Sequence, residues 1–271
     1  MRKFFVAVLT LLACLCMFIS CGGGGGGNGG DSFWGGDDGN DGNGGSGGSG
    51  GDAGTGTALD DIGIMKSIVL DSGQGFSYAV TTTDKIIITG LTLEGEQWNS
   101  INIPSYIDGK EVVAIGKNAF KGASSGLTSI SLPDSIIDIR QEAFSDCSGL
   151  VNINIPANVI RIGAYAFREC SNWTSELQLP DSLKLLGTCA FTFCSNLYGT
   201  VSIPNGLKYI EAYTFNQCNG LTSVIFENTE PPVVMDNAFG PIPSIQVPYS
   251  LVDTYKGATG WTPYSTKISG Y

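Results

Sequence analysis

Residues 127–149 read LTSISLPDSIIDIRQEAFSDCSG, and variants of this stretch recur through the second half of the chain. The phenylalanine of its Ala-Phe pair returns at steps of 24, 23, 24, 24 and 24 residues, at Phe120, Phe144, Phe167, Phe191, Phe215 and Phe239. A proline returns with nearly the same period, at Pro104, Pro133, Pro156, Pro180 and Pro204. One fixed period of about 20–30 residues is typical of a solenoid. The sequence therefore predicts a repeat solenoid of stacked coils.

Each repeat predicts two short strands joined by turns, so the fold is mainly β. An alternating run such as ISL points its apolar members inward, and proline ends the strand because it cannot donate the next ladder bond. A second run such as IIDI returns across the other side, and Ala-Phe follows it. Stacked coils hold equivalent residues about 4.8 Å apart. We therefore expect the phenylalanines to form one column along the solenoid axis.

The quoted repeat resembles the BspA-type leucine-rich repeat in its apolar, proline, Ala-Phe and cysteine positions, over about residues 100–265. The stretch IQVPYSLVDTYKGATGW, residues 245–261, is similar to the terminal unit that follows such arrays. Departures are Ala123 in place of cysteine, Thr214 in place of alanine and Glu227 in place of proline. The resemblance implies a bacterial surface protein that adheres to other cells or to host matrix proteins.

The chain opens with Arg2 and Lys3, an apolar run from Phe4 to Ile19, and then Cys21. A basic start, an apolar run and a small residue before the cut are typical of a secretory signal. The ending in cysteine resembles a bacterial lipoprotein signal, which makes Cys21 the predicted lipidated residue. The LLAC stretch ending at Cys14 is an alternative lipidation motif, but its apolar run is short.

Residues 22–57 carry 20 of the chain's 39 glycines, which predicts a flexible tether. Within it, GGNGGDSFW is a single calcium-type nonapeptide without tandem copies, and DDGNDGNGG lacks the glutamate that ends an EF-hand loop. We therefore predict no metal site there. The expected segments are a signal peptide (1–20), a lipidated tether (21–57), a β-rich N-cap (58–100), a leucine-rich repeat solenoid of about six coils (101–240) and a C-terminal capping unit (241–271).

Composition limits the partners. The 14 Lys and Arg against 25 Asp and Glu give a net charge of −11. Binding to nucleic acid or to an anionic membrane surface needs clustered basic residues, so both are disfavoured and the lipid is the predicted membrane contact. We expect an exported chain anchored at the outer membrane or cell surface of a Gram-negative bacterium, with the periplasmic face as an alternative.

A second column is predicted for the cysteines, which step by 23, 24 and 24 residues at Cys147, Cys170, Cys194 and Cys218. A straight row cannot enclose a tetrahedral zinc ion, and strand spacing slightly exceeds the Cβ separation of a disulfide. Burial as small apolar residues fits best, with disulfides between neighbours as the alternative. Cys189 lies off the column and is expected to pack near a corner.

Catalysis is disfavoured because the chain has no histidine. This removes the usual base for a cysteine or serine nucleophile and the histidine metal sites. A carboxylate pair of the glycosidase kind remains conceivable, but no pair stands out. We predict a non-enzymatic protein without a cofactor.

Two outward rows of side chains are candidates for binding. The first strands place outward Asn102, Ser131, Asn154, Gln178, Ser202, Ile225 and Gln246. The second strands place outward Ala114, Asp138, Arg161, Leu185 and Tyr209. From these rows we select Asn154, Gln178, Ser202, Arg161 and Tyr209 as ligand-binding candidates. The alternative is that outward positions are polar only for solubility.

Aromatic residues divide between surface and core. Tyr165, Tyr198, Tyr209 and Tyr213 could stack on a sugar or anchor a protein, or pack at corners. Trp98 and Trp261 are expected to close the two ends of the array, and Trp173 to pack at a turn. The expected partner is a host-matrix or cell-surface protein, or a glycan, bound by a monomer. Alternative functions are a carbohydrate-capturing accessory protein of a nutrient-uptake system and a structural spacer without a ligand.

Overall fold

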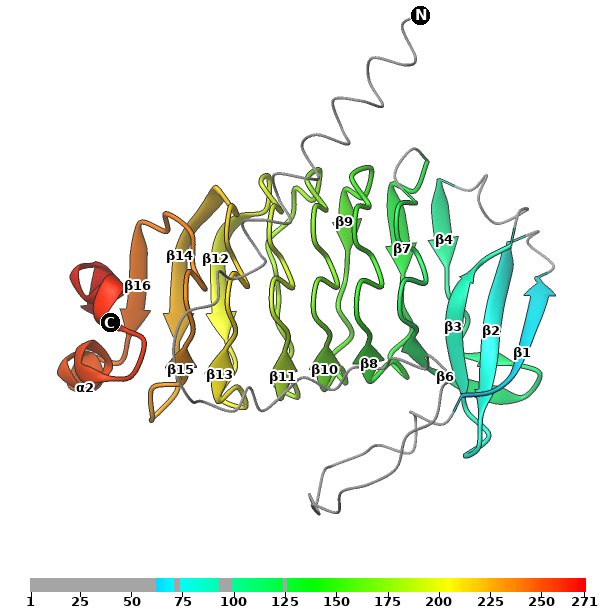
Figure 1. Cartoon of the computed structure of the whole chain (residues 1–271), viewed down its shortest axis with the longest axis horizontal. Helices are drawn as coiled ribbons and strands as arrows, with labels where there is room; N and C mark the ends of the chain where they lie inside the picture. The colour runs from blue at the N-terminus through cyan, green and yellow to red at the C-terminus, as the bar shows by residue number, and fades with distance from the viewer. Residues whose placement is uncertain (1–61, 71–73, 93–98, 124–125) are drawn as a thin grey trace, which may run out of the picture. The chain divides into compact units, whose positions relative to one another are not determined.

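A computed structural model describes residues 62–70, 74–92, 99–123 and 126–271 (Figure 1). All of them belong to one compact unit, Thr57–Tyr271. The predicted signal peptide, Cys21, the tether and Trp98 lie outside the described residues. Within them the predicted solenoid fold is confirmed, because short strands stack coil on coil in parallel register. The coils are numbered I to VI here by their phenylalanines, from Phe120 in coil I to Phe239 in coil VI.

An antiparallel cap begins the array. Strand β1 (Ile62–Val69) pairs with β2 (Gly75–Thr81), and β2 pairs with β3 (Ile86–Leu91). Strand β3 then lies parallel to β6 (Lys110–Ile115), whose other partner in this cap is the short antiparallel β5 (Tyr106–Ile107). The inward side chains of β2 and β3 are buried, namely Phe76, Tyr78, Ile86 and Ile88. The cap thus covers the apolar end of coil I.

The second strands of the coils line up in one row, which forms two separate sheets (Figure 1). After β6 come β8 (Asp138–Ile139), β10 (Arg161–Ile162) and β11 (Leu185–Leu186), all parallel. Strands β13 (Tyr209–Ile210) and β15 (Val233–Val234) pair farther along.

The first strands form two separate sheets. One contains β4 (Ser100–Asn102), β7 (Ser129–Ser131) and β9 (Asn152–Ile153). The other contains β12 (Tyr198–Ile203), β14 (Gly220–Phe226), β16 (Ser244–Val247) and β17 (Ile268–Gly270). The intervening segment of coil IV, residues 174–179, is not a strand. Pairing in this row is therefore interrupted between β9 and β12.

The third side of each coil is a chain of tight turns built on two residues with positive φ. In coil II these are Glu142 (φ 54°) and Asp146 (φ 62°), and equivalent residues repeat in the later coils. Their N–H groups donate to the next coil, from Glu142 to the Ala164 carbonyl at 3.0 Å and from Asp146 to the Arg168 carbonyl at 2.7 Å. A left-handed L-residue costs roughly 1–2 kcal/mol, and the hydrogen bonds between coils offset that cost.

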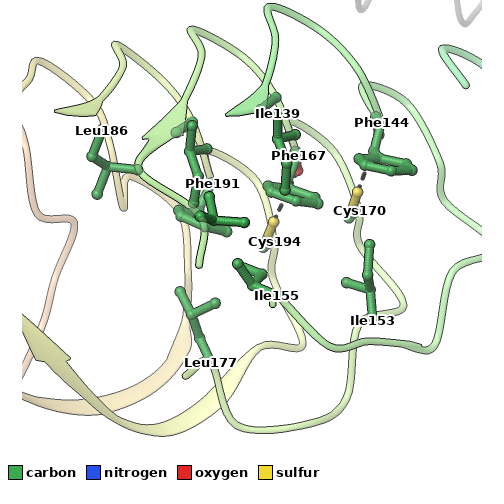
Figure 2. Packing of buried hydrophobic residues seen from close by; sticks show 14 of the residues in the cluster. Ile139, Phe144, Ile153, Ile155, Phe167, Cys170, Leu177, Leu186, Phe191 and Cys194 are labelled. Carbon is green, nitrogen blue, oxygen red and sulfur yellow. Dashed lines mark hydrogen bonds between the residues drawn. The ribbon is translucent and has the colours of Figure 1, made fainter. Parts of the chain in front are cut away.

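Phenylalanine and cysteine columns fill the core (Figure 2). Successive phenylalanine rings have centroids 5.2–5.9 Å apart and planes within 7° of parallel, so they are offset-stacked. The four column thiols are buried and form no disulfide. Each column thiol also donates to a phenylalanine carbonyl of the preceding coil, for example Cys170 Sγ to Phe144 O at 3.2 Å and Cys194 Sγ to Phe167 O at 3.1 Å. The thiols therefore link coils as well as fill space.

A compact aromatic cluster closes the C-terminal end. It is carried by a 3-10 turn η2 (Tyr249–Leu251), helix α2 (Val252–Gly257) and a second 3-10 segment η3 (Thr262–Lys267). Trp261 is fully buried, with ring centroids 4.9 Å from Tyr255 and 5.0 Å from Phe226. Its Nε1 donates to the Pro232 carbonyl at 2.8 Å. Trp261 thus seals the last coil, whereas Trp173 packs edge-on against Phe167 and Phe191 inside the array.

Candidate binding face

A polar strip runs along the first-strand row. Its outward side chains are exposed while the residues between them are buried. The exposed members are Asn102, Ser131, Asn154, Gln178 and Ser202. Ile225 and Gln246 at the C-terminal end are half-buried. The structure therefore brings three of the selected candidates onto one face, namely Asn154, Gln178 and Ser202.

The strip is hollowed where strand pairing is interrupted. A hollow of about 200 Å³ lies between coils III and IV. Its polar lining is Asn152, Asn154, Ser175, Glu176 and Gln178, and its apolar lining is Ile153, Ile155, Trp173 and Leu177. Figure 2 shows Ile153, Ile155 and Leu177 directed toward the interior columns. The apolar side chains are buried and form the floor, and the polar side chains form the rim.

Two hydrogen bonds fix the polar wall of this hollow. Trp173 Nε1 donates to Ser175 Oγ at 2.6 Å, and Ser175 Oγ donates to Asn152 Oδ1 at 3.4 Å. Sequence reasoning selected Asn154 and Gln178 here but missed Asn152, Ser175 and Glu176. The sequence signal for them is a longer repeat, because the segment from Trp173 to Pro180 has one residue more than the equivalent segment from Leu150 to Pro156.

Arg161 and Tyr209, the other two candidates, lie on the second-strand row, on β10 and β13. Arg161 binds the buried Asp138 of the preceding coil, with Nε–Oδ1 at 2.9 Å and Nη2–Oδ2 at 2.6 Å, and Arg140 Nε donates to the same carboxylate at 3.1 Å. Asp138 and Ala114 lie in this row in register with each other, but the expectation that they are open to a ligand is wrong, because both are buried. The guanidinium groups of Arg140 and Arg161 cover Asp138, so these side chains hold neighbouring coils together and Asp138 is not open to a ligand as predicted.

A larger and more apolar groove of about 560 Å³ also lies along this second row. Val113, Ile137 and Ile160 form its apolar part, and Ile160 is 44% exposed. The Lys85–Glu111 ion pair, at 2.8 Å, lines the N-terminal end.

The four tyrosines considered as stacking residues differ in exposure. Tyr198, at the start of β12, is 49% exposed and Tyr209 is 43% exposed. Tyr165 and Tyr213 are half-buried at positive-φ turn positions. Tyr198 is thus the exposed aromatic on the strand that follows the hollow.

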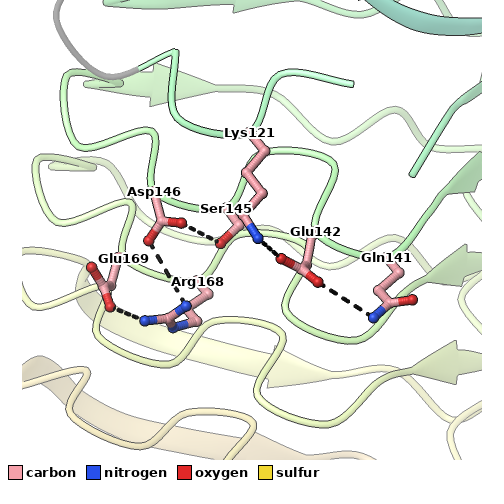
Figure 3. A network of polar contacts seen from close by, with 7 residues as sticks. All are labelled: Lys121, Gln141, Glu142, Ser145, Asp146, Arg168 and Glu169. Carbon is pink, nitrogen blue, oxygen red and sulfur yellow. Dashed lines mark hydrogen bonds and ion pairs between the residues drawn. The ribbon is translucent and has the colours of Figure 1, made fainter. Parts of the chain in front are cut away.

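Carboxylates on the turn side are engaged with basic and polar side chains (Figure 3). Lys121 pairs with Glu142, and Arg168 pairs with both Asp146 and Glu169. Burial raises the pKa of Glu169, and the neighbouring Arg168 opposes that rise. Among residues 62–271 that the structure describes, no group of three or more metal-ligating side chains is found. This network links neighbouring coils on the turn side.

The column cysteines are chemically quiet. Burial raises the pKa of the Cys147 thiol to about 12 and raises the pKa of Cys194 and Cys218 well above the ordinary value. A thiolate is the reactive form. These thiols therefore have the character of packing residues.

Residues 113–246 match the family model described as BspA type leucine rich repeat region, in 6 copies. Residues 113–246 form a BspA-type leucine-rich repeat region. The repeat resemblance drawn from the Pro, Ala-Phe and Cys positions is thereby confirmed. Proteins of this type are typically exposed on the bacterial surface, and their solenoids are typically non-enzymatic binding scaffolds.

The chain is similar to several solved structures of bacterial proteins. The pneumococcal vaccine antigen PcpA matches with a TM-score of 0.53 at 18% identity, over 71% of this chain and 46% of that one. A leucine-rich repeat protein from Bacteroides ovatus matches with a TM-score of 0.49 at 22% identity, over 65% of this chain and 55% of that one. The leucine-rich repeat protein of T. pallidum matches with a TM-score of 0.46 at 29% identity, over 56% of this chain and 82% of that one.

The chain spans about half the length of the Bacteroides ovatus and pneumococcal proteins, at 55% and 46%. No curated protein gives a match. In the part of the chain that the structure describes, no helix has the length and apolar character needed to cross a membrane.

Proposed function

We propose that this chain is an exported, lipid-anchored, non-enzymatic binding protein of the bacterial cell surface. Its partner is a host-matrix protein, another surface protein or a glycan, and its binding surface is the polar strip of the first-strand row. The observation that carries the proposal is the strip itself, which stays exposed and polar over coils I to V while its neighbours are buried. Regular solenoids use such continuous faces for binding.

The surface location rests on the resemblance of residues 1–21 to a lipoprotein signal and on the family's typical address. Protease treatment of intact cells tests it. Cleavage of the folded unit by added protease supports surface display, whereas protection until the outer membrane is opened places the chain in the periplasm.

Binding is tested with the full chain carrying Cys21→Ser, which removes the predicted lipid acceptor. The chain is applied to arrays of matrix proteins and glycans, beside the variants Asn154→Ala and Ser202→Ala on the strip and Tyr209→Ala on the second row. We expect a saturable partner that the strip variants weaken and Tyr209→Ala leaves unchanged. Loss of binding only with Tyr209→Ala moves the site to the second row. No partner on either array, with the chain folded, supports the spacer function instead.

A glycan partner would assign the chain to carbohydrate capture. Two observations favour keeping this candidate beside protein adhesion. The hollow presents amide, hydroxyl and carboxylate groups together, and Tyr198 is half exposed on the strand that follows.

A further inference from the structure

The interruption of strand pairing in coil IV has a local cause in the sequence. From the buried residue that follows the cysteine turn to the proline, coil III takes six steps, Leu150 to Pro156. Coil IV takes seven, Trp173 to Pro180, and coil V also takes seven, Leu197 to Pro204. Coils IV and V must therefore each accommodate one extra residue in this row.

Coil V absorbs the extra residue as a β-bulge. Gly199 has φ 84°, and the register of β12 against β14 shifts between Gly199 and Thr200. Glycine adopts this conformation without steric cost. The equivalent residue of coil IV is Ser175, which is not among the residues with positive φ. Coil IV thus lacks the glycine that lets the longer segment rejoin the sheet.

As a result, backbone groups in this row lack strand partners. In the part of the chain that the structure describes, the backbone of residues 175–179 forms no hydrogen bonds with β9 or β12. The last backbone hydrogen bond before the interruption runs from Thr174 N to the Val151 carbonyl at 3.1 Å. Backbone N–H and C=O groups require hydrogen-bond partners. The hollow between coils III and IV therefore combines unpaired peptide groups with polar side chains.

The hollow is too constrained to admit another strand. On the second-strand row, β10 and β11 keep parallel register. In the core, the Phe167 and Phe191 rings remain stacked at 5.3 Å. Because coils III and IV stay at normal spacing on both other sides, they cannot separate by the further ~4.8 Å that an inserted strand needs. The space suits a small polar group instead.

The groups around the hollow match a sugar ring. Asn152, Asn154 and Gln178 offer amides that donate and accept, and Glu176 offers a carboxylate that accepts from hydroxyl groups. A single carboxylate without a second metal-ligating side chain is a poor cation site. We propose that this hollow binds one unit of a neutral saccharide through these side chains and the free peptide groups of residues 175–179. The proposal rests on the proposed function, in which the strip is the binding surface.

Hydrogen exchange of the free full chain tests the interruption itself. Amides of residues 175–179 exchange faster than those of β12, and Ser175→Gly, which allows the bulge of coil V, slows them. Ser175→Ala is the matched control because it removes the same hydroxyl without freeing the backbone, and it leaves the exchange fast. Equal exchange in the two segments of the wild type overturns the proposal.

Saccharide binding is measured by saturation-transfer NMR with glucose, galactose, mannose and N-acetylglucosamine. We expect at least one to bind and to protect the amides of residues 175–179, with Gln178→Ala and Asn154→Ala each weakening it about 2- to 13-fold, as for one lost hydrogen bond. Asn158→Ala removes an exposed amide that lines the second-row groove and neither the strip nor the hollow, and it leaves the affinity unchanged. Weakening by Asn158→Ala to the same extent overturns the local site.

The two proposals fail in different ways. If none of the four sugars binds but a protein partner does and requires Asn154 and Ser202, the saccharide site is wrong and the binding strip stands. If a sugar binds and neither Gln178→Ala nor Asn154→Ala weakens it, the hollow is not its site. If a sugar protects residues 175–179 and no protein partner is found, the strip is a glycan-binding face.

Discussion

Removing one ring from the middle of the phenylalanine column measures how strongly the coils depend on one another. Phe191 is fully buried, and its ring stacks on Phe167 at 5.3 Å and on Phe215 at 5.6 Å. Trp173 adds an edge contact at 6.1 Å. Phe191→Ala therefore removes one buried side chain and three aromatic pairs.

The magnitude follows from these contacts. Burial and cavity formation make a Phe→Ala change cost about 3–5 kcal/mol in a core. Phe120, at the N-terminal end of the column, is equally buried but stacks on Phe144 alone among the described residues, at 5.2 Å. Each aromatic pair contributes about 0.5–1.5 kcal/mol beyond burial. Phe191→Ala should therefore destabilise the protein by about 1–3 kcal/mol more than Phe120→Ala.

Denaturant unfolding, followed by circular dichroism, gives both free energies. Because each coil contacts only its neighbours, Phe191→Ala should also lower the m-value by partly uncoupling the two halves, whereas Phe120→Ala should not. Equal free energies for the two variants would refute the contribution of stacking. A loss below about 1.5 kcal/mol for Phe191→Ala would refute tight packing of the column.

Three further predictions concern charge and burial. Burial raises the pKa of Cys147 to about 12, so the unfolded thiol ionises first as pH rises. This one thiol should lower the free energy of unfolding by about 1.4 kcal/mol per pH unit above about pH 8.5. The slope in Cys147→Ala, measured by denaturant titration, should be shallower than the wild-type slope by that amount. Burial also raises the pKa of the half-buried Glu211, so its charge opposes folding above the ordinary carboxyl range. Glu211→Gln should therefore raise the melting temperature at pH 7 and lose that advantage near pH 3. An equal gain at both pH values would contradict the role of the buried charge. Arg161→Ala leaves the buried Asp138 with Arg140 as its ion-pair partner. It should lower the free energy of unfolding by about 1–3 kcal/mol without changing the affinity for the partner. Weaker binding at unchanged stability would show that Arg161 belongs to the binding site.

The period and the alternation of apolar residues were sufficient to predict the solenoid, because a coil repeated every 23 or 24 residues places equivalent side chains in columns. The same logic placed Asn154, Gln178 and Ser202 on one outward strip. It failed at Asp138, since a period of two separates inward from outward positions but does not show that Arg140 and Arg161 cover a carboxylate.

Contacts between coils were decided by the tertiary structure. The thiol of Cys194 reaches the Phe167 carbonyl only because the positive-φ turns bring that carbonyl within 3.1 Å. The seven-residue step of coil IV is visible in the sequence, but the same step gives a bulge in coil V and an interruption in coil IV. Backbone freedom at Gly199, which Ser175 lacks, separates these outcomes. Periodicity thus determined which residues share a face, whereas register between coils determined where that face is closed and where it is open.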